Sequence, residues 1–161
     1  MSQLSNETLL ALDAAQNSYI NALDSKSMEG WLASFTEEGS YICIAAENEA
    51  NNLPIALMLD DCYARLQDRV TYVTKVWAGT FEDYQTRHFT QRISAEAVGN
   101  DTYKVITNYH ILFTPEQGQT NVLVTGHYDD EIVLSGDTAR FKSKKAVMDT
   151  NISPRYIVYP V

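Results

Sequence analysis

The spacing of apolar residues changes from a helical to a strand-like period part-way along the chain. Residues 5–24 carry apolar side chains every three or four positions, broken by Gln16, and this predicts a first helix. A short second helix is expected over residues 28–35, ended by the acidic pair and glycine that follow it, with Trp31 on its core side. A third is expected to start at residue 60 or 61 and to run through residue 70. The first half therefore reads as mainly helical.

The second half alternates apolar and polar residues and is divided by short Gly, Asn and Asp turns. It predicts four strands in succession, at residues 86–96, 103–114, 121–134 and 139–148. A shorter strand at residues 40–46 and a polar loop at residues 47–52 are expected before them. Strands this long exceed the usual length of about five or six residues, which favours a curved, bulged sheet. Helices followed by a long curled antiparallel sheet predict one cone-shaped α+β domain over residues 1–161.

Alternation also assigns side chains to the two faces of the predicted sheet. In the last strand, Phe141 and Val147 fall on the core face, and Lys144 falls on the other face. With Lys142 and Lys145 it forms a small basic cluster, which we expect to be solvated.

Composition narrows the classes of partner. The formal net charge is −9 and the pI is near 4.7, which argues against binding to nucleic acid or to an anionic membrane surface. The N-terminus has no signal-peptide pattern and no apolar run is long enough to cross a bilayer, so a cytoplasmic protein is expected. Cys43 and Cys62 belong to no metal-binding or catalytic motif, and we expect two buried, reduced thiols.

Candidate chemistry is sparse. His88, His110 and His127 fall on successive predicted strands and would suit zinc or iron if they shared a face, but no ligand-spacing motif accompanies them. We therefore expect no metal on this chain. An acid–base pocket inside the cone would draw on Tyr41, His88, His110 and Asp130.

Several segments carry a resemblance to a known family. They are "LDSKSMEGWLASFTEEGSY" from residue 23, "LQDRV" from residue 66, "WAGTFEDYQTRHF" from residue 77, "GHYDDEI" from residue 126 and "FKSKKAVMDT" from residue 141. In this order, the chain resembles the small (beta) subunit of Rieske-type aromatic-ring-hydroxylating dioxygenases. The loop "AGTFEDYQ" contains no proline, which points toward the branch that acts on acidic or amino-substituted rings, such as salicylate, anthranilate or terephthalate.

The resemblance implies a fold, a function and a partner. The fold would be that of nuclear transport factor 2 and ketosteroid isomerase (NTF2-like). The function would be that of a non-catalytic subunit in an NAD(P)H-dependent oxygenase that degrades aromatic compounds. The Rieske 2Fe–2S cluster and the mononuclear iron would reside on a large (alpha) subunit, and this chain, without a cofactor of its own, would trimerise within an α3β3 hexamer.

Interface residues are predicted from residue type. Aromatic residues and arginine anchor protein interfaces, so Trp77, Tyr84, Arg87 and His88 are expected at or near a subunit boundary. For Trp77, a position in the core is an equal alternative. Two alternatives remain open. One is a free-standing lyase or isomerase of the same fold with the acid–base pocket named above, and the other is a homodimer that binds a small ligand.

Overall fold

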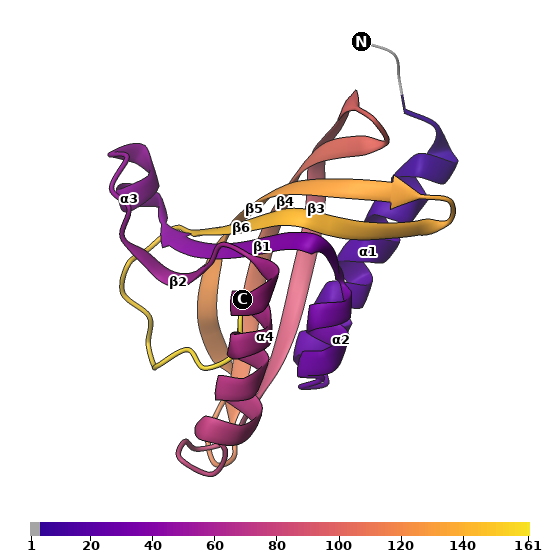
Figure 1. Ribbon diagram of the computed structural model, residues 1–161. Coiled ribbons are helices and arrows are strands. Elements are labelled where there is room, and N and C mark those ends of the chain that lie inside the picture. The colour runs from indigo at the N-terminus through magenta and orange to yellow at the C-terminus, as the bar shows by residue number, and fades with distance from the viewer. Residues whose placement is uncertain (1–3) are drawn as a thin grey trace.

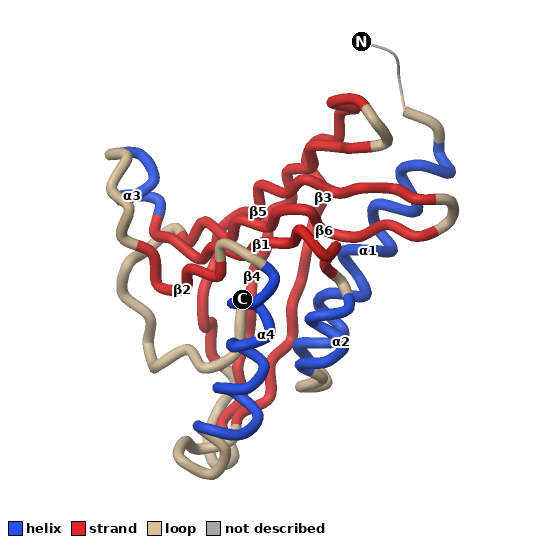
Figure 2. Tube along the Cα trace, in the orientation of Figure 1, coloured by secondary structure: helices blue, strands red, loops and turns tan. Residues whose placement is uncertain are grey.

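The computed structural model describes residues 4–161 as a strongly curved sheet with α1, α2 and α4 packed against it and the short α3 projecting beyond the end of β1 (Figures 1 and 2). The six strands have the order β2-β1-β6-β5-β4-β3. The helical elements are α1 (Asn6–Asp24), α2 (Met28–Ala33), α3 (Ala46–Ala50), α4 (Tyr63–Thr71) and the π-helical turn η1 (Tyr72–Val76). The strands are β1 (Phe35–Ala45), β2 (Ala56–Asp60), β3 (Tyr84–Gly99), β4 (Thr102–Pro115), β5 (Asn121–Ser135) and β6 (Thr138–Met148).

The first helix and the four long strands match the predictions closely. Ser5 caps α1 by accepting a hydrogen bond from the backbone N–H of Thr8, and the buried stripe of α1 includes Leu12 and Tyr19. The long strands extend beyond their predicted limits by no more than three residues at either end. The cone-shaped α+β arrangement is therefore the one that the apolar pattern predicts.

The segment between α1 and α4 differs from the predictions. The second helix ends at Ala33, and β1 already begins at Phe35, so the acidic pair lies in a strand. The predicted loop at residues 47–52 is largely occupied by the short helix α3, and β2 was not predicted at all. The sheet is also not wholly antiparallel, because β1 runs parallel to β6. The parallel pairing of β1 with β6 joins segments far apart in the sequence, so the local pattern does not contain it.

A bulge between β5 and β6 reverses the predicted face of Lys144. Ile132 pairs with Phe141, but the preceding Glu131 pairs with Ser143, so Lys142 is an extra residue. An extra residue changes the parity of the alternation. Phe141 and Lys144 consequently lie on the same inner face, and the expectation that Lys144 belongs to a solvated cluster was wrong.

Aromatic side chains fill the interior between α1, α2 and the sheet. Trp31 is fully buried and packs edge-on against Phe35 and Tyr41, which confirms its predicted core position. Tyr19 makes further edge-on contacts with Phe141. The two cysteines differ in solvent exposure. Cys43 is buried, whereas Cys62 is exposed, so the prediction of two buried thiols was wrong for Cys62.

Candidate functional site

Tyrosines and the last residues of the chain pack together on the inner side of the curved sheet. Tyr19 donates a hydrogen bond of 2.8 Å from its hydroxyl to the carbonyl oxygen of Val161. The Tyr41 hydroxyl donates to the same oxygen at 3.1 Å and accepts from the Val161 N–H at 3.0 Å. Burial raises the pKa of both phenols well above the usual value, so neither ionises at neutral pH. These contacts make a plug rather than an open cavity.

A sealed ion pair lies behind this plug. The Lys144 Nζ atom is 2.8 Å from Asp130 Oδ2 and donates a second hydrogen bond of 3.0 Å to Gln16 Oε1. The side chains of Lys144 and Asp130 have 0% and 0% solvent exposure. The ammonium also lies over three aromatic rings, 3.8 Å from the centroid of Tyr128 and 4.1 Å from that of Phe141, with the Tyr19 ring at 4.3 Å. The cation therefore has both a carboxylate and an aromatic cage.

Burial shifts both members of the pair toward their neutral forms. Desolvation raises the pKa of Asp130 to about 6, although the attraction of Lys144 opposes the shift. Desolvation likewise lowers the pKa of Lys144 to about 8, against the attraction of Asp130. Both groups are charged near neutral pH. Shifted carboxylates are common in active sites, but this one has no exposed atom to offer a substrate.

A second ionisable dyad, of the buried His88 and the half-buried Asp24, joins β3 to the end of α1. His88 Nδ1 is 2.6 Å from Asp24 Oδ1, and the backbone N–H of His88 donates to Asp24 Oδ2 at 3.0 Å. The Thr86 hydroxyl donates to the same carboxylate at 2.8 Å. Burial raises the pKa of Asp24, but the hydrogen bonds from His88 and Thr86 and the electrostatic attraction of the His88 ring outweigh it, so the net pKa is lowered. The dyad fixes the start of β3 against α1.

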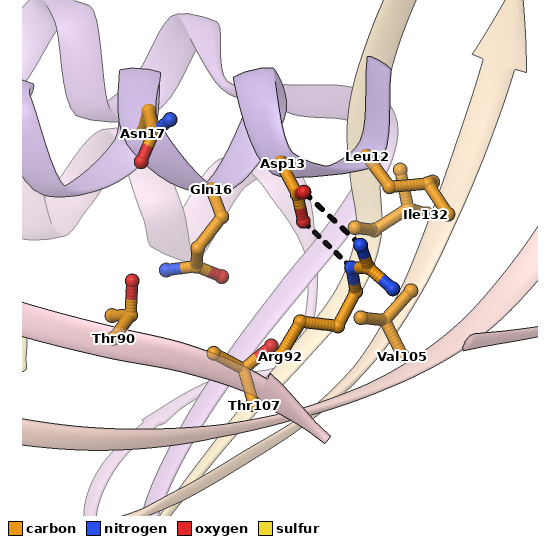
Figure 3. Close-up of a pocket in the computed structure, with 9 residues that line it drawn as sticks. All are labelled: Leu12, Asp13, Gln16, Asn17, Thr90, Arg92, Val105, Thr107 and Ile132. Atoms are coloured by element: carbon orange, nitrogen blue, oxygen red, sulfur yellow. Dashed lines mark hydrogen bonds and ion pairs between the residues drawn. The ribbon is translucent and has the colours of Figure 1, made fainter. Parts of the chain in front are cut away.

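A pocket of about 340 Å³ opens between α1 and the inner face of the sheet (Figure 3). Arg92 and Asp13 bridge it with two hydrogen bonds of 2.7 and 3.1 Å. Gln16 separates the pocket from the sealed ion pair, as its oxygen is already bonded to Lys144. The remaining lining residues are Leu12, Asn17, Thr90, Val105, Thr107 and Ile132. The two charged residues that line this pocket, Arg92 and Asp13, thus form an ion pair with each other. Asp130 and Lys144 do not line it.

The structure does not bring the four predicted pocket residues together. Tyr41, His88 and Asp130 are buried on the inner side of the sheet. His110 lies on the outer face, where its ring centroid is 5.6 Å from that of Phe89. None of these four residues lines the pocket of Figure 3.

The four predicted interface residues also separate. Tyr84 is buried and accepts a hydrogen bond from the Val158 N–H, and His88 is buried in its dyad. Arg87 points to the opposite face of β3 and is exposed, and Trp77 is half-buried beside Tyr72. Of the four, Arg87 and Trp77 are the residues that a partner reaches without rearrangement, and their interface role stays a prediction.

Sequence reasoning missed the residues that organise the interior. Gln16 was visible as the polar break in an apolar helical stripe, and this is the signal that could have found it. Lys144 was concealed by the bulge. Asp13 and Asp24 give no local signal, because their partners lie 79 and 64 residues away.

Two wider properties follow from the described residues. Among residues 4–161, no three His, Cys, Asp or Glu side chains are grouped so that they could hold a metal ion. No helix in this part of the chain has the length and apolar character needed to cross a membrane.

Comparison with known proteins identifies the family. The family described as "Ring hydroxylating beta subunit" matches residues 20–155, which is most of the chain. The chain belongs to the ring-hydroxylating beta-subunit family. This confirms the resemblance inferred from the sequence, and a small (beta) subunit of this family implies an alpha oxygenase subunit as partner.

Individual members of the beta-subunit family support the same assignment. The anthranilate 1,2-dioxygenase small subunit of Burkholderia cepacia is 30% identical over 146 residues, covering 91% of this chain and 89% of that protein. A terephthalate 1,2-dioxygenase beta subunit of Comamonas sp is 24% identical, covering 97% and 99%. The crystal structure of the beta subunit of a proposed aromatic-ring-hydroxylating dioxygenase from Novosphingobium aromaticivorans superposes with a TM-score of 0.78 at 32% identity, covering 87% and 88%. The predicted NTF2-like fold is confirmed.

Proposed function

We propose that this beta subunit is non-catalytic and supports a large subunit that carries the Rieske 2Fe–2S cluster and the mononuclear iron. The complex would be an α3β3 hexamer in the cytoplasm, supplied with electrons from NAD(P)H. It would hydroxylate an aromatic ring that bears an acidic or amino group, as the name of the anthranilate relative suggests. The observation that carries the proposal is the complete burial of the titrating Asp130–Lys144 pair, which leaves neither group exposed to a substrate.

The alternative function is that of a free-standing enzyme that uses acid–base catalysis. The raised pKa of Asp130 and the lowered pKa of Lys144 favour it, because such shifts cluster at catalytic sites. A catalytic acid or base must come within hydrogen-bond reach of its substrate. Gln16 and the aromatic cage around Lys144 occupy that space. The shifted pKa values therefore have a structural explanation in burial.

The test is co-expression of this chain with its cognate large subunit. Light scattering should give the mass of a hexamer, and iron should remain with the large subunit after the two chains are separated. Neither chain alone should sustain ring hydroxylation at the rate of the complex. The proposal fails if the isolated chain holds about one iron atom, if it does not associate with the large subunit, or if it turns over a substrate unaided.

One substitution distinguishes a supporting role of this chain from a catalytic role. Asp130→Asn keeps the shape of the side chain and removes its ability to act as an acid or base. Turnover per assembled, iron-loaded complex should equal that of the wild type. A loss of more than about tenfold in complexes of normal mass and iron content would favour the acid–base reading.

A further inference from the structure

Exposed apolar side chains gather at both ends of the strand order, on β2 and on β3 to β5. The first group lies on and beside β2, an edge strand of the sheet. This edge patch consists of Leu53, Ile55, Leu57, Leu59 and Ile152, exposed by 43 to 77%. In β2 itself Met58 and Asp60 are buried while Leu57 and Leu59 point away from the core. An apolar edge of this kind is a ready surface for another chain.

The second group lies on the outer face of the other end of the sheet. This outer-face patch consists of Arg87, Phe89, His110, Leu112 and Val122, which are neighbours through the pairing of β3, β4 and β5. Phe89 and Val122 are exposed by 57% and 48%. An exposed phenyl ring beside a guanidinium has the composition of an interface centre.

The two patches differ in charge. Arg87 donates to its neighbour's carbonyl oxygen, and no carboxylate of residues 4–161 forms an ion pair with it. Glu47 of α3 sits beside the edge patch, where Asn151 donates to its carboxylate at 3.1 Å, and no cation of the described chain pairs with it. The outer-face patch therefore contains a cation without an ion-pair partner, and the edge patch has an anion without an ion-pair partner beside it. In a chain of net charge −9, local complementarity of this kind is what permits two copies to approach.

We propose that the edge patch of one copy packs against the outer-face patch of the next copy. A closed ring of identical subunits needs two different, complementary surfaces on each subunit, and these two surfaces lie toward opposite edges of the sheet. The inference rests on the proposed function, because it names the surfaces that join the three small subunits within the hexamer. Glu47 of one copy then faces Arg87 of its neighbour.

Charge reversal tests the pairing. Arg87→Glu and Glu47→Arg should each raise the dissociation constant between small subunits about tenfold, measured by sedimentation of the complex with the large subunit over a dilution series. The double variant Arg87→Glu/Glu47→Arg should recover most of the loss. Leu57→Lys should weaken assembly by a similar factor, whereas Leu10→Lys, at a 69% exposed position on α1 outside both patches, should not. Unchanged thermal unfolding of each isolated variant shows that folding is intact.

The outcomes separate this inference from the proposed function. Loss on single reversal with recovery in the double variant supports the pairing. Wild-type mass for both single reversals and for Leu57→Lys overturns it while the supporting role stands. If the single reversals disrupt assembly and the double variant does not recover it, the pairing is also overturned. The same holds if the variants release the large subunit while the trimer of small subunits stays intact. A wild-type chain that never joins the large subunit contradicts the proposed function instead.

Discussion

The Asp130–Lys144 pair gives the sharpest prediction about stability. Lys144→Met removes the ammonium and leaves Asp130 buried without its cation, and Asp130→Val does the reverse. With the two atoms 2.8 Å apart, Coulomb's law at an effective dielectric constant of about 20 gives an attraction of roughly 6 kcal/mol. Desolvation of both charges offsets most of it. Each single variant should therefore lose about 3–5 kcal/mol of unfolding free energy.

The double variant Lys144→Met/Asp130→Val should behave differently. Replacing a buried pair by apolar residues of similar size is often neutral or stabilising by about 1–4 kcal/mol. The coupling energy from the four proteins, measured by urea denaturation, should therefore be several kcal/mol. If the losses of unfolding free energy are additive, so that the double variant is less stable than either single variant, the two charges do not compensate each other and the reasoning is refuted.

The pH dependence of the same comparison follows from the pKa values. The folded pKa of Asp130, about 6, lies above its ordinary 3.8, so its contribution is full below 3.8 and is lost as pH rises through 6. The folded pKa of Lys144, about 8, lies below its ordinary 10.5, so its contribution is full above 10.5 and is lost as pH falls through 8. Wild-type stability relative to the double variant should be lowest between these values and rise by on the order of 1 kcal/mol at about pH 5. A pH-independent difference would contradict this account.

Three further predictions concern the interior and the absence of a cofactor on this chain. Trp31→Ala should lower the unfolding free energy by about 3–5 kcal/mol in thermal or urea denaturation, because its fully buried ring packs on Phe35 and Tyr41; an unchanged midpoint would contradict this packing. Gln16→Leu should lower it by about 1.5–3 kcal/mol through the lost hydrogen bond to the Lys144 ammonium, whereas the exposed Asn17→Ala should have little effect. Elemental analysis of the isolated chain should find no stoichiometric iron or zinc, and one retained metal per chain would contradict the expectation.

The strand pattern of the second half was predictable because hairpins are local. Gly, Asn and Asp turns separate residues that pair with their nearest neighbours in sequence, and β3 to β6 follow that rule. The parallel pairing of β1 with β6 joins segments about a hundred residues apart, and the local sequence of neither segment predicts it. β2 has only five residues, too few for a clear periodic signal.

The interior site was less predictable than the fold. Candidate residues were chosen by type, and type alone placed His110 beside Tyr41 although the two occupy opposite faces of the sheet. The polar contacts of the interior centre on Gln16 and Lys144. The pattern predicts an apolar residue at position 16 and an exposed side chain at position 144. The polar break in the helical stripe pointed to Gln16, but finding Lys144 required the register of β5 on β6, which a single bulge changes by one residue.

The buried pair also disfavours a shifted register of β6. Asp130 lies opposite Lys144, flanked by Asp129 opposite Lys145 and by Glu131 opposite Ser143. A one-residue slip of β6 turns the Lys144 side chain outward and leaves Asp130 in the core without a cation, which costs several kcal/mol. Apolar residues at both positions carry no such penalty, so the double variant should keep its stability while populating a second register. Two sets of amide resonances for β6 in its NMR spectrum, against one set in the wild type, are the expected result. A single set in the double variant would show that the bulge and the core aromatics fix the register without the ion pair.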